Sequence, residues 1–269
     1  MPELPEITSR ACELQSFLPG KQFSNFAIIQ SKSLNIPPQD FSAALVGASV
    51  LQVTNRGKWI FIHTDRGYLL LNLGMGGEIT RCTPQTLPTK HRFIIFLSNG
   101  EVLSINFWWF GYIHFVPEGQ LANHALTSSL GPNALELSVD EFLKIITGQR
   151  GRIKTYLLDQ KNLAGIGNAY IHDILFLARL HPLRLVSSLS QFELINLYAA
   201  IHQGLQPALD LGGAFYEQTI DGKPGGFGME HILIGYQEGK PCPNCSTPIQ
   251  KIKTGSTTSF ICPTCQPLE

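Results

Sequence analysis

Four cysteines near the end of the chain constrain its fold more than any other feature. They form two pairs, Cys242-Pro-Asn-Cys245 and Cys262-Pro-Thr-Cys265, with sixteen residues between the pairs. Two C-x2-C knuckles at this spacing are typical of a zinc ribbon, in which four thiolates hold one structural ion. The disulfide alternative requires a secreted chain. The first residues lack the basic segment and apolar run of a secretory signal, so we expect a cytoplasmic protein with one structural Zn2+ per chain.

The composition is that of an ordinary globular protein long enough for two domains. Apolar residues make up 43% of the 269 residues and charged residues 15%, which argues against disorder. The longest apolar stretch, residues 107–116, is interrupted by Gly111 and His114 and is too short to span a bilayer, so we expect no membrane association.

The charge balance is neutral, which is unusual for a protein that binds nucleic acid. Twenty basic and twenty acidic residues cancel, whereas a basic surplus is the common electrostatic signature of such proteins. A local basic patch can still exist in a neutral chain. The candidate here lies between residues 144 and 161, where Arg150 and Lys154 stand among other cations.

The first half of the chain has the pattern of a β domain. Short runs rich in β-branched and aromatic residues alternate with turn signals such as Asn99-Gly100, and this regular spacing favours a β-sandwich or barrel. One helix is expected before it. The expected strands are Phe26–Ile29, Val50–Val53, Trp59–Ile62, Tyr68–Leu73, Phe93–Leu97 and Val102–Ile105.

After Gly131-Pro132 the apolar spacing changes from that of strands to that of helices. Ser138 and Ser190 each precede a helical stretch, with a glutamate three residues later, which is the sequence signature of a capping box. The expected helices are Val139–Ile146, Ile153–Leu158, Asn168–Arg179 and Gln191–Leu211.

The first six residues, Met-Pro-Glu-Leu-Pro-Glu, combine an unusual amine with two carboxylates. If Met1 is removed, Pro2 presents a secondary amine, which can attack a sugar carbon and form an iminium in the manner of a Schiff-base enzyme. Glu3 and Glu6 stand where carboxylates can transfer protons and where they also favour a helix N-terminus. The two roles are compatible.

Together, the Pro-Glu-Leu-Pro-Glu start and the C-terminal zinc ribbon resemble the formamidopyrimidine-DNA glycosylase and endonuclease VIII family of repair enzymes. The resemblance implies a multi-domain α+β fold in three parts. Residues 1–130 would form a catalytic β-sandwich with one helix, residues 131–228 a helical domain of the helix–two-turn–helix type, and residues 229–269 the ribbon. It also implies damaged DNA as the partner, and we expect a monomer.

The same resemblance assigns catalytic roles. It makes Pro2 the nucleophile, Glu3 the group that transfers protons at the sugar, and Glu6 a supporting carboxylate. Lys58, in the turn Asn55-Arg-Gly-Lys58, would contact the phosphate beside the lesion.

Further residues would contact DNA. The resemblance implies that Met75 in Leu-Gly-Met and Phe110 in Phe-Gly fill the gap left by a flipped base, and that His91 contacts the strand. Gly165-Ile-Gly-Asn168 resembles the family's helix–two-turn–helix signature, in which Asn168 and backbone N–H groups bind phosphate. Arg150 and Lys154 lie on the segment before it.

Several positions depart from the family pattern. Trp108 and Trp109 stand where the bacterial purine-repair branch has two arginines, Thr257 replaces an arginine of the ribbon, and Asn72 replaces a histidine. Tryptophan cannot form the bidentate hydrogen bonds of arginine with a base edge, but it can stack on an exposed base. We therefore expect weaker discrimination of the opposite base, with single-stranded, bubble or bulky-lesion DNA better suited than an oxoguanine–cytosine pair.

The resulting hypothesis is a base-excision repair glycosylase with abasic-site lyase activity. Its substrates would be oxidised bases, either of the formamidopyrimidine and oxoguanine class or oxidised pyrimidines. We expect β-elimination, and not δ-elimination because of Thr257. The alternative is a non-catalytic protein that binds damaged DNA on the same scaffold. The sequence does not determine the lesion, because that choice depends on the geometry of the loop around residues 212–228.

Overall fold

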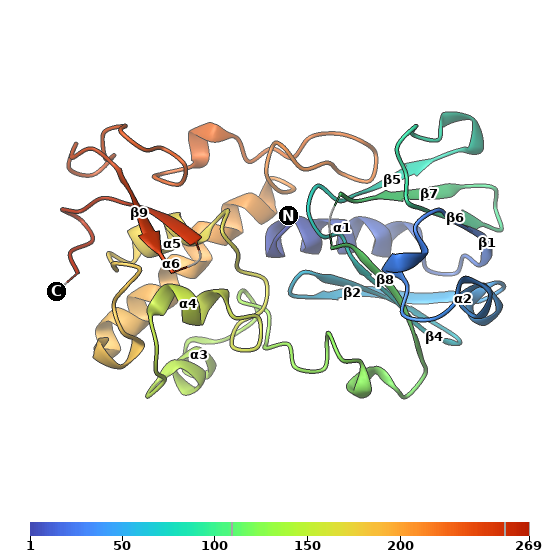
Figure 1. Ribbon diagram of the computed structural model, residues 1–269, viewed down its shortest axis with the longest axis horizontal. Coiled ribbons are helices and arrows are strands. Elements are labelled where there is room, and N and C mark those ends of the chain that lie inside the picture. The colour runs from blue at the N-terminus through green and yellow to red at the C-terminus, as the bar shows by residue number, and fades with distance from the viewer. Residues whose placement is uncertain (109, 256, 269) are drawn as a thin grey trace. The chain divides into compact units, whose positions relative to one another are not determined.

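A computed structural model describes residues 1–108, 110–255 and 257–268 (Figure 1). The chain forms two compact units. The first contains Met1–Ser129 and Leu211–Gly226, and the second contains Leu130–Asp210 and Phe227–Glu269. The segment 211–226, which the sequence analysis assigned to the helical domain, thus packs with the β domain. Trp109 lies outside the described residues.

Two antiparallel sheets form most of the first unit, which confirms the expected β-sandwich. One sheet has the order β1 (Phe23–Ile28), β6 (Phe93–Leu97), β7 (Val102–Asn106), β5 (Glu78–Cys82). The other has the order β2 (Val50–Arg56), β3 (Trp59–Thr64), β4 (Gly67–Asn72), β8 (Tyr112–Pro117). The sequence analysis missed β5 and β8, because β5 is largely polar and β8 continues a long apolar run.

Two helices complete the first unit. Helix α1 (Leu4–Phe17) packs against β2 and β3, and α2 (Pro38–Leu45) packs against β1. The shared core includes a cluster of aromatic rings, in which Phe26 and Phe93 each contact Phe41 at centroid distances of 5.4 and 5.6 Å. Edge-to-face pairs at this distance add to the free energy gained from burial. This core fixes the position of α1 and therefore of the residues at its start.

The second unit contains four helices and the ribbon hairpin. The helices are α3 (Val139–Ile146), α4 (Ile153–Leu158), α5 (Ile171–Leu177) and α6 (Gln191–Asp210), and the hairpin consists of β9 (Gln250–Thr254) and β10 (Thr257–Ile261). At α3 the Ser138 N–H donates to Glu141 Oε2 at 2.8 Å, and the Glu141 N–H donates to Ser138 Oγ. This confirms the predicted capping box. Among the described residues, no helix is both long and apolar enough to cross a membrane.

Candidate active site and zinc centre

Two buried carboxylates surround the start of α1. Glu3 and Glu6 are 4% and 3% exposed, and the backbone N–H of Glu3 donates to Glu6 Oε2 at 2.8 Å. The positive end of a helix dipole and its unpaired N–H groups stabilise carboxylates at this place. Pro2 is buried beside them. The structure therefore brings Pro2, Glu3 and Glu6 together, as the sequence analysis expected.

The polar side of α1 is bound to the loop 211–226. Glu6 Oε1 accepts a hydrogen bond from the Ala214 N–H at 3.0 Å, and Glu13 Oε2 accepts one from the Ile220 N–H at 2.9 Å. Between them, the Arg10 guanidinium donates to the carbonyls of Gly212 and Gln218. These bonds run along one side of the helix because residues three and four apart share a face.

Gly213 allows this close approach. Its φ of +99° lies in the left-handed region, and a Cβ at this position would come within 2.8 Å of Glu6 Cγ. Glycine is the residue that adopts such a backbone without steric cost.

A third acid, Glu217, extends from this loop toward the N-terminus. It is 9% exposed, and its Oε1 lies 3.8 Å from the amine of Met1. Burial raises the pKa of Glu217 to about 7. The positive charges of the N-terminal ammonium and Arg10 oppose this rise, whereas the negative charges of Glu6 and Glu3 add to it. Glu217 thus lies within electrostatic range of the N-terminal amine and of the carboxylates of Glu3 and Glu6.

Lys58 lies in the tight turn between β2 and β3, which is held by strand pairing and by a hydrogen bond from Asn72. It follows Gly57, whose φ is +55°, and Arg56 pairs with Trp59 across the turn. The Asn72 amide donates to the Lys58 carbonyl at 3.0 Å, while its oxygen accepts from the Gly74 N–H at 3.1 Å. Asn72, one of the departures from the family pattern, thus connects the lysine turn to the loop that carries Met75.

The β2 end of this hairpin is also bound to α1. The Asn55 amide donates to Thr8 Oγ1 at 3.0 Å. Because Thr8 lies in the second turn of α1, the Lys58 turn is held near the start of the helix that carries Glu3 and Glu6.

Three large apolar side chains project from two neighbouring loops of the first unit. Met75, Trp108 and Phe110 are 47%, 65% and 70% exposed, and the Trp108 N–H donates to the Met75 carbonyl at 2.9 Å. Exposed apolar groups that cluster in this way mark binding surfaces. Gly76 permits the arrangement, since a Cβ there would come within 2.9 Å of the Trp108 indole.

A cavity of about 370 Å3 lies beside Trp108. It is lined by Thr89, Lys90, His91, Arg92, Asn106 and Trp108. The predicted DNA-contacting His91 is held there by its Nδ1, which lies 2.7 Å from the Pro88 carbonyl.

In the second unit, Arg150 and Asn168 are exposed, as residues that contact DNA must be, but Lys154 is only 3% exposed. The Lys154 ammonium donates to the Thr258 carbonyl at 2.6 Å, to Ser259 Oγ at 2.8 Å, and to the hydroxyls of Thr254 and Thr257. Burial lowers its pKa to about 8. The Lys154 side chain therefore contacts the ribbon hairpin directly, and the Thr257 hydroxyl is one of its hydrogen-bond acceptors.

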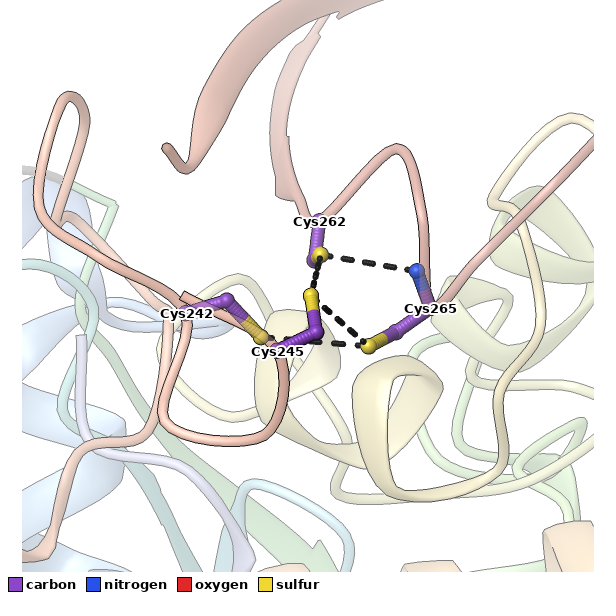
Figure 2. Close-up of side chains that lie close together, drawn as sticks. All are labelled: Cys242, Cys245, Cys262 and Cys265. Atoms are coloured by element: carbon purple, nitrogen blue, oxygen red, sulfur yellow. Dashed lines mark hydrogen bonds between the residues drawn. The ribbon is translucent and has the colours of Figure 1, made fainter. Parts of the chain in front are cut away.

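The four ribbon cysteines converge on one point from two loops, as Figure 2 shows. All their Sγ atoms lie within 4.8 Å of one another, and the pair Cys242 and Cys265 is 3.8 Å apart. A tetrahedral site with Zn–S bonds of about 2.3 Å requires sulfur separations of about 3.8 Å. The donor set thus fits a closed structural Zn2+ site, whereas sulfur atoms in a disulfide would lie about 2 Å apart.

Sequence comparisons place known domains along the chain. Residues 1–107 match the formamidopyrimidine-DNA glycosylase N-terminal domain, residues 130–219 its H2TH domain, and residues 239–268 a zinc finger found in FPG and IleRS. The formamidopyrimidine-DNA glycosylase of Pelotomaculum thermopropionicum is 37% identical, with 99% of each chain covered. That of Photobacterium profundum is 31% identical over 99% of this chain and 100% of its own length.

Solved structures give the same result for the fold. A Lactococcus lactis FPG mutant bound to Fapy-dG DNA superposes with a TM-score of 0.89 at 25% identity, covering 99% of this chain and 100% of the other. The MutM (FPG) protein from Thermus thermophilus gives a TM-score of 0.86 at 29% identity, with 98% of each chain covered.

Sequence reasoning missed three residues that build the site: Arg10, Glu13 and Glu217. A local signal existed for the first two, because charged residues at positions 6, 10 and 13 recur at helical spacing along one face of α1, where Glu6 and Arg10 are buried. Nothing near Glu217 in the sequence indicates that it reaches the N-terminus.

We predict that the purified protein contains one zinc ion per chain and that Cys262→Ser largely removes it. Cys262 is fully buried, and a serine hydroxyl is a poor replacement for a thiolate ligand. Zinc content by elemental analysis checks this. Cys12→Ser is the matched control, since Cys12 is exposed on α1 and lies outside the cluster. An unchanged zinc content in Cys262→Ser would contradict the assignment.

Proposed function

The chain belongs to the formamidopyrimidine-DNA glycosylase family, and we propose that it excises oxidised bases through an imine on Pro2 and then cleaves the strand. The observation that carries this proposal is the buried pair Glu3 and Glu6 beside Pro2. Full-length similarity to enzymes, together with this intact group, favours catalysis over the damage-binding alternative. We propose that it acts as a monomer on damaged DNA.

The proposed reaction begins once Met1 is removed and Pro2 carries a free secondary amine. Its lone pair attacks C1′ of the damaged nucleotide, and the bond from C1′ to the base breaks with its electrons leaving on the base, which takes up a proton. The attached nitrogen then loses its proton as O4′ gains one, the ring opens, and an iminium forms. Glu3 is the group that moves these protons.

Strand cleavage follows from the iminium. It acidifies the hydrogens at C2′, and loss of one of them expels the 3′ phosphate by β-elimination. Lys58 would hold a phosphate beside the lesion. Thr257 is neutral, and its hydroxyl accepts a hydrogen bond from Lys154. Because residue 257 carries no charge that could assist a second elimination, we propose that the reaction stops at β-elimination.

We further propose that the exposed group Met75, Trp108 and Phe110 enters DNA where the damaged base leaves the stack. Extruding a base leaves a gap that a side chain can fill. Apolar wedges perform this role without recognising a particular base. The zinc ion supplies no chemistry in this scheme, since four thiolates close its coordination shell.

Glu3→Gln tests the proposed reaction. Glutamine keeps the length and polarity of the side chain but cannot transfer the proton, so excision of an oxidised base should fall at least 100-fold. Incision at a preformed abasic site should fall less, because ring opening still uses Glu3 but no base has to be protonated and leave there. Single-turnover rates on both substrates measure the difference. Glu118→Gln, an exposed carboxylate of the same unit, is the control. Equal losses on both substrates would contradict the role of Glu3.

Trp108 tests the proposed substrate preference. The wild type should excise a lesion from single-stranded or bubble DNA at least as fast as from a duplex. Trp108→Ala should weaken binding to single-stranded DNA by roughly tenfold, because stacking on an aromatic ring contributes about 1–3 kcal/mol per base. Fluorescence anisotropy and excision rates on matched oligonucleotides measure both effects. A strong preference of the wild type for duplex DNA would contradict this proposal.

A further inference from the structure

The mechanism proposed above leaves one buried acid of the first unit unused. Glu217 comes from the loop 211–226 and places its carboxylate 3.8 Å from the N-terminal amine. Its backbone position is fixed, because the Glu217 N–H donates to the Ala214 carbonyl and its own carbonyl accepts from Gly225. The acid is thus held at the N-terminus by a loop that is itself bound to α1.

The reaction requires a group of this kind. A free α-amine has an ordinary pKa of about 8, so an amine of this class is mostly protonated at neutral pH. An ammonium has no lone pair and cannot attack C1′. The amine must therefore transfer a proton before each turnover, and a nearby base that accepts it would make the nucleophile available at neutral pH.

Removal of Met1 keeps the amine within the same neighbourhood. The nitrogen of Pro2 is three bonds from that of Met1, which corresponds to less than about 4 Å. The charged groups whose fields reach Glu217 are the amine and, on α1, Glu3, Glu6 and Arg10. Arg10 offsets one of the three negative charges, but its guanidinium is already bonded to loop carbonyls and to Glu13.

We propose that Glu217 is the base that deprotonates the Pro2 amine. The proton moves from the secondary ammonium to a Glu217 carboxylate oxygen, leaving a neutral amine with a free lone pair and a neutral carboxylic acid. No further reactant is needed. This inference rests on the proposed imine mechanism and adds to it the group that activates the nucleophile.

The physical environment favours this transfer. Burial destabilises the Glu217 carboxylate, so the neutral acid that forms when Glu217 takes up a proton is favoured. Burial raises the pKa of Glu217 to about 7, which brings it close to the ordinary pKa of an α-amine. Proton transfer between groups of similar pKa costs little free energy.

Glu3 and Glu6 are less suited to this role. Glu6 uses both carboxylate oxygens as acceptors, one for the Glu3 N–H and one for the Ala214 N–H, so protonating it would disrupt the loop contact. Glu3 has the separate task of moving protons at the sugar. A third acid allows the amine to be activated while Glu3 remains available for the departing base.

The test measures the rate of borohydride-trapped adduct formation on abasic-site DNA between pH 6 and 9.5. The wild-type rate should rise with pH through about 7. Glu217→Gln should shift this rise upward by about one pH unit, because the amine then loses its proton only to solvent. We expect a rate roughly tenfold below wild type at pH 6.5 and within threefold at pH 9. Glu217→Asp, which keeps a carboxylate, should retain the wild-type pH dependence.

Two controls separate the possible outcomes. Asp221→Asn changes an exposed acid of the same loop and should behave as wild type. Affinity for DNA containing a tetrahydrofuran abasic analogue shows whether each variant is folded and binds. A Glu217→Gln variant with an unshifted profile, or with an equal loss at every pH, overturns the inference while the imine mechanism stands. Failure of the wild type to form any adduct overturns the imine mechanism itself.

Discussion

The Glu6 carboxylate is the contact on which the organisation of the site depends. One oxygen accepts from the N–H of Glu3, and the other accepts from the N–H of Ala214, which is 208 positions away in sequence. A buried carboxylate is costly unless it is hydrogen-bonded, and here both oxygens have donors. The start of α1 and the loop 211–226 are therefore fixed by the same group. The positions of Pro2, Glu3 and Glu217 all follow from it.

The sequence predicted the parts of the structure that local patterns determine. The bounds of α3 and α4 agree with helical spacing, the Ser138 cap is present, and the cysteine spacing identified the metal site. What the sequence did not reveal depends on contacts between distant segments. The loop 211–226 leaves the helical region and joins the β domain, and no periodic pattern encodes a pairing between Glu217 and the chain terminus.

In the second unit, the predicted basic patch also includes a residue whose role depends on contacts with a distant segment. Lys154 is a cation that the sequence analysis assigned to DNA, yet its ammonium lies within hydrogen-bond distance of four oxygens of the ribbon hairpin, which share its three N–H donors. A buried lysine usually pairs with a carboxylate, but among the described residues Lys154 is surrounded by neutral oxygens that replace water. The chain has a net charge of zero, and the exposed Trp108 stands at a position where the family pattern has an arginine. DNA affinity should therefore depend on salt less steeply than in a strongly basic binder.

The imine on Pro2 is the central claim, and peptide mapping of the trapped complex tests it most directly. The protein would be incubated with DNA carrying an abasic site, reduced with borohydride and digested, and the peptide that carries the sugar fragment would be identified by mass spectrometry. The proposed mechanism predicts that the fragment is attached to the N-terminal peptide, that this peptide begins at Pro2, and that the link is at the proline nitrogen. Attachment to a lysine such as Lys58, or no adduct from protein confirmed to lack Met1 and to bind the DNA, would contradict it.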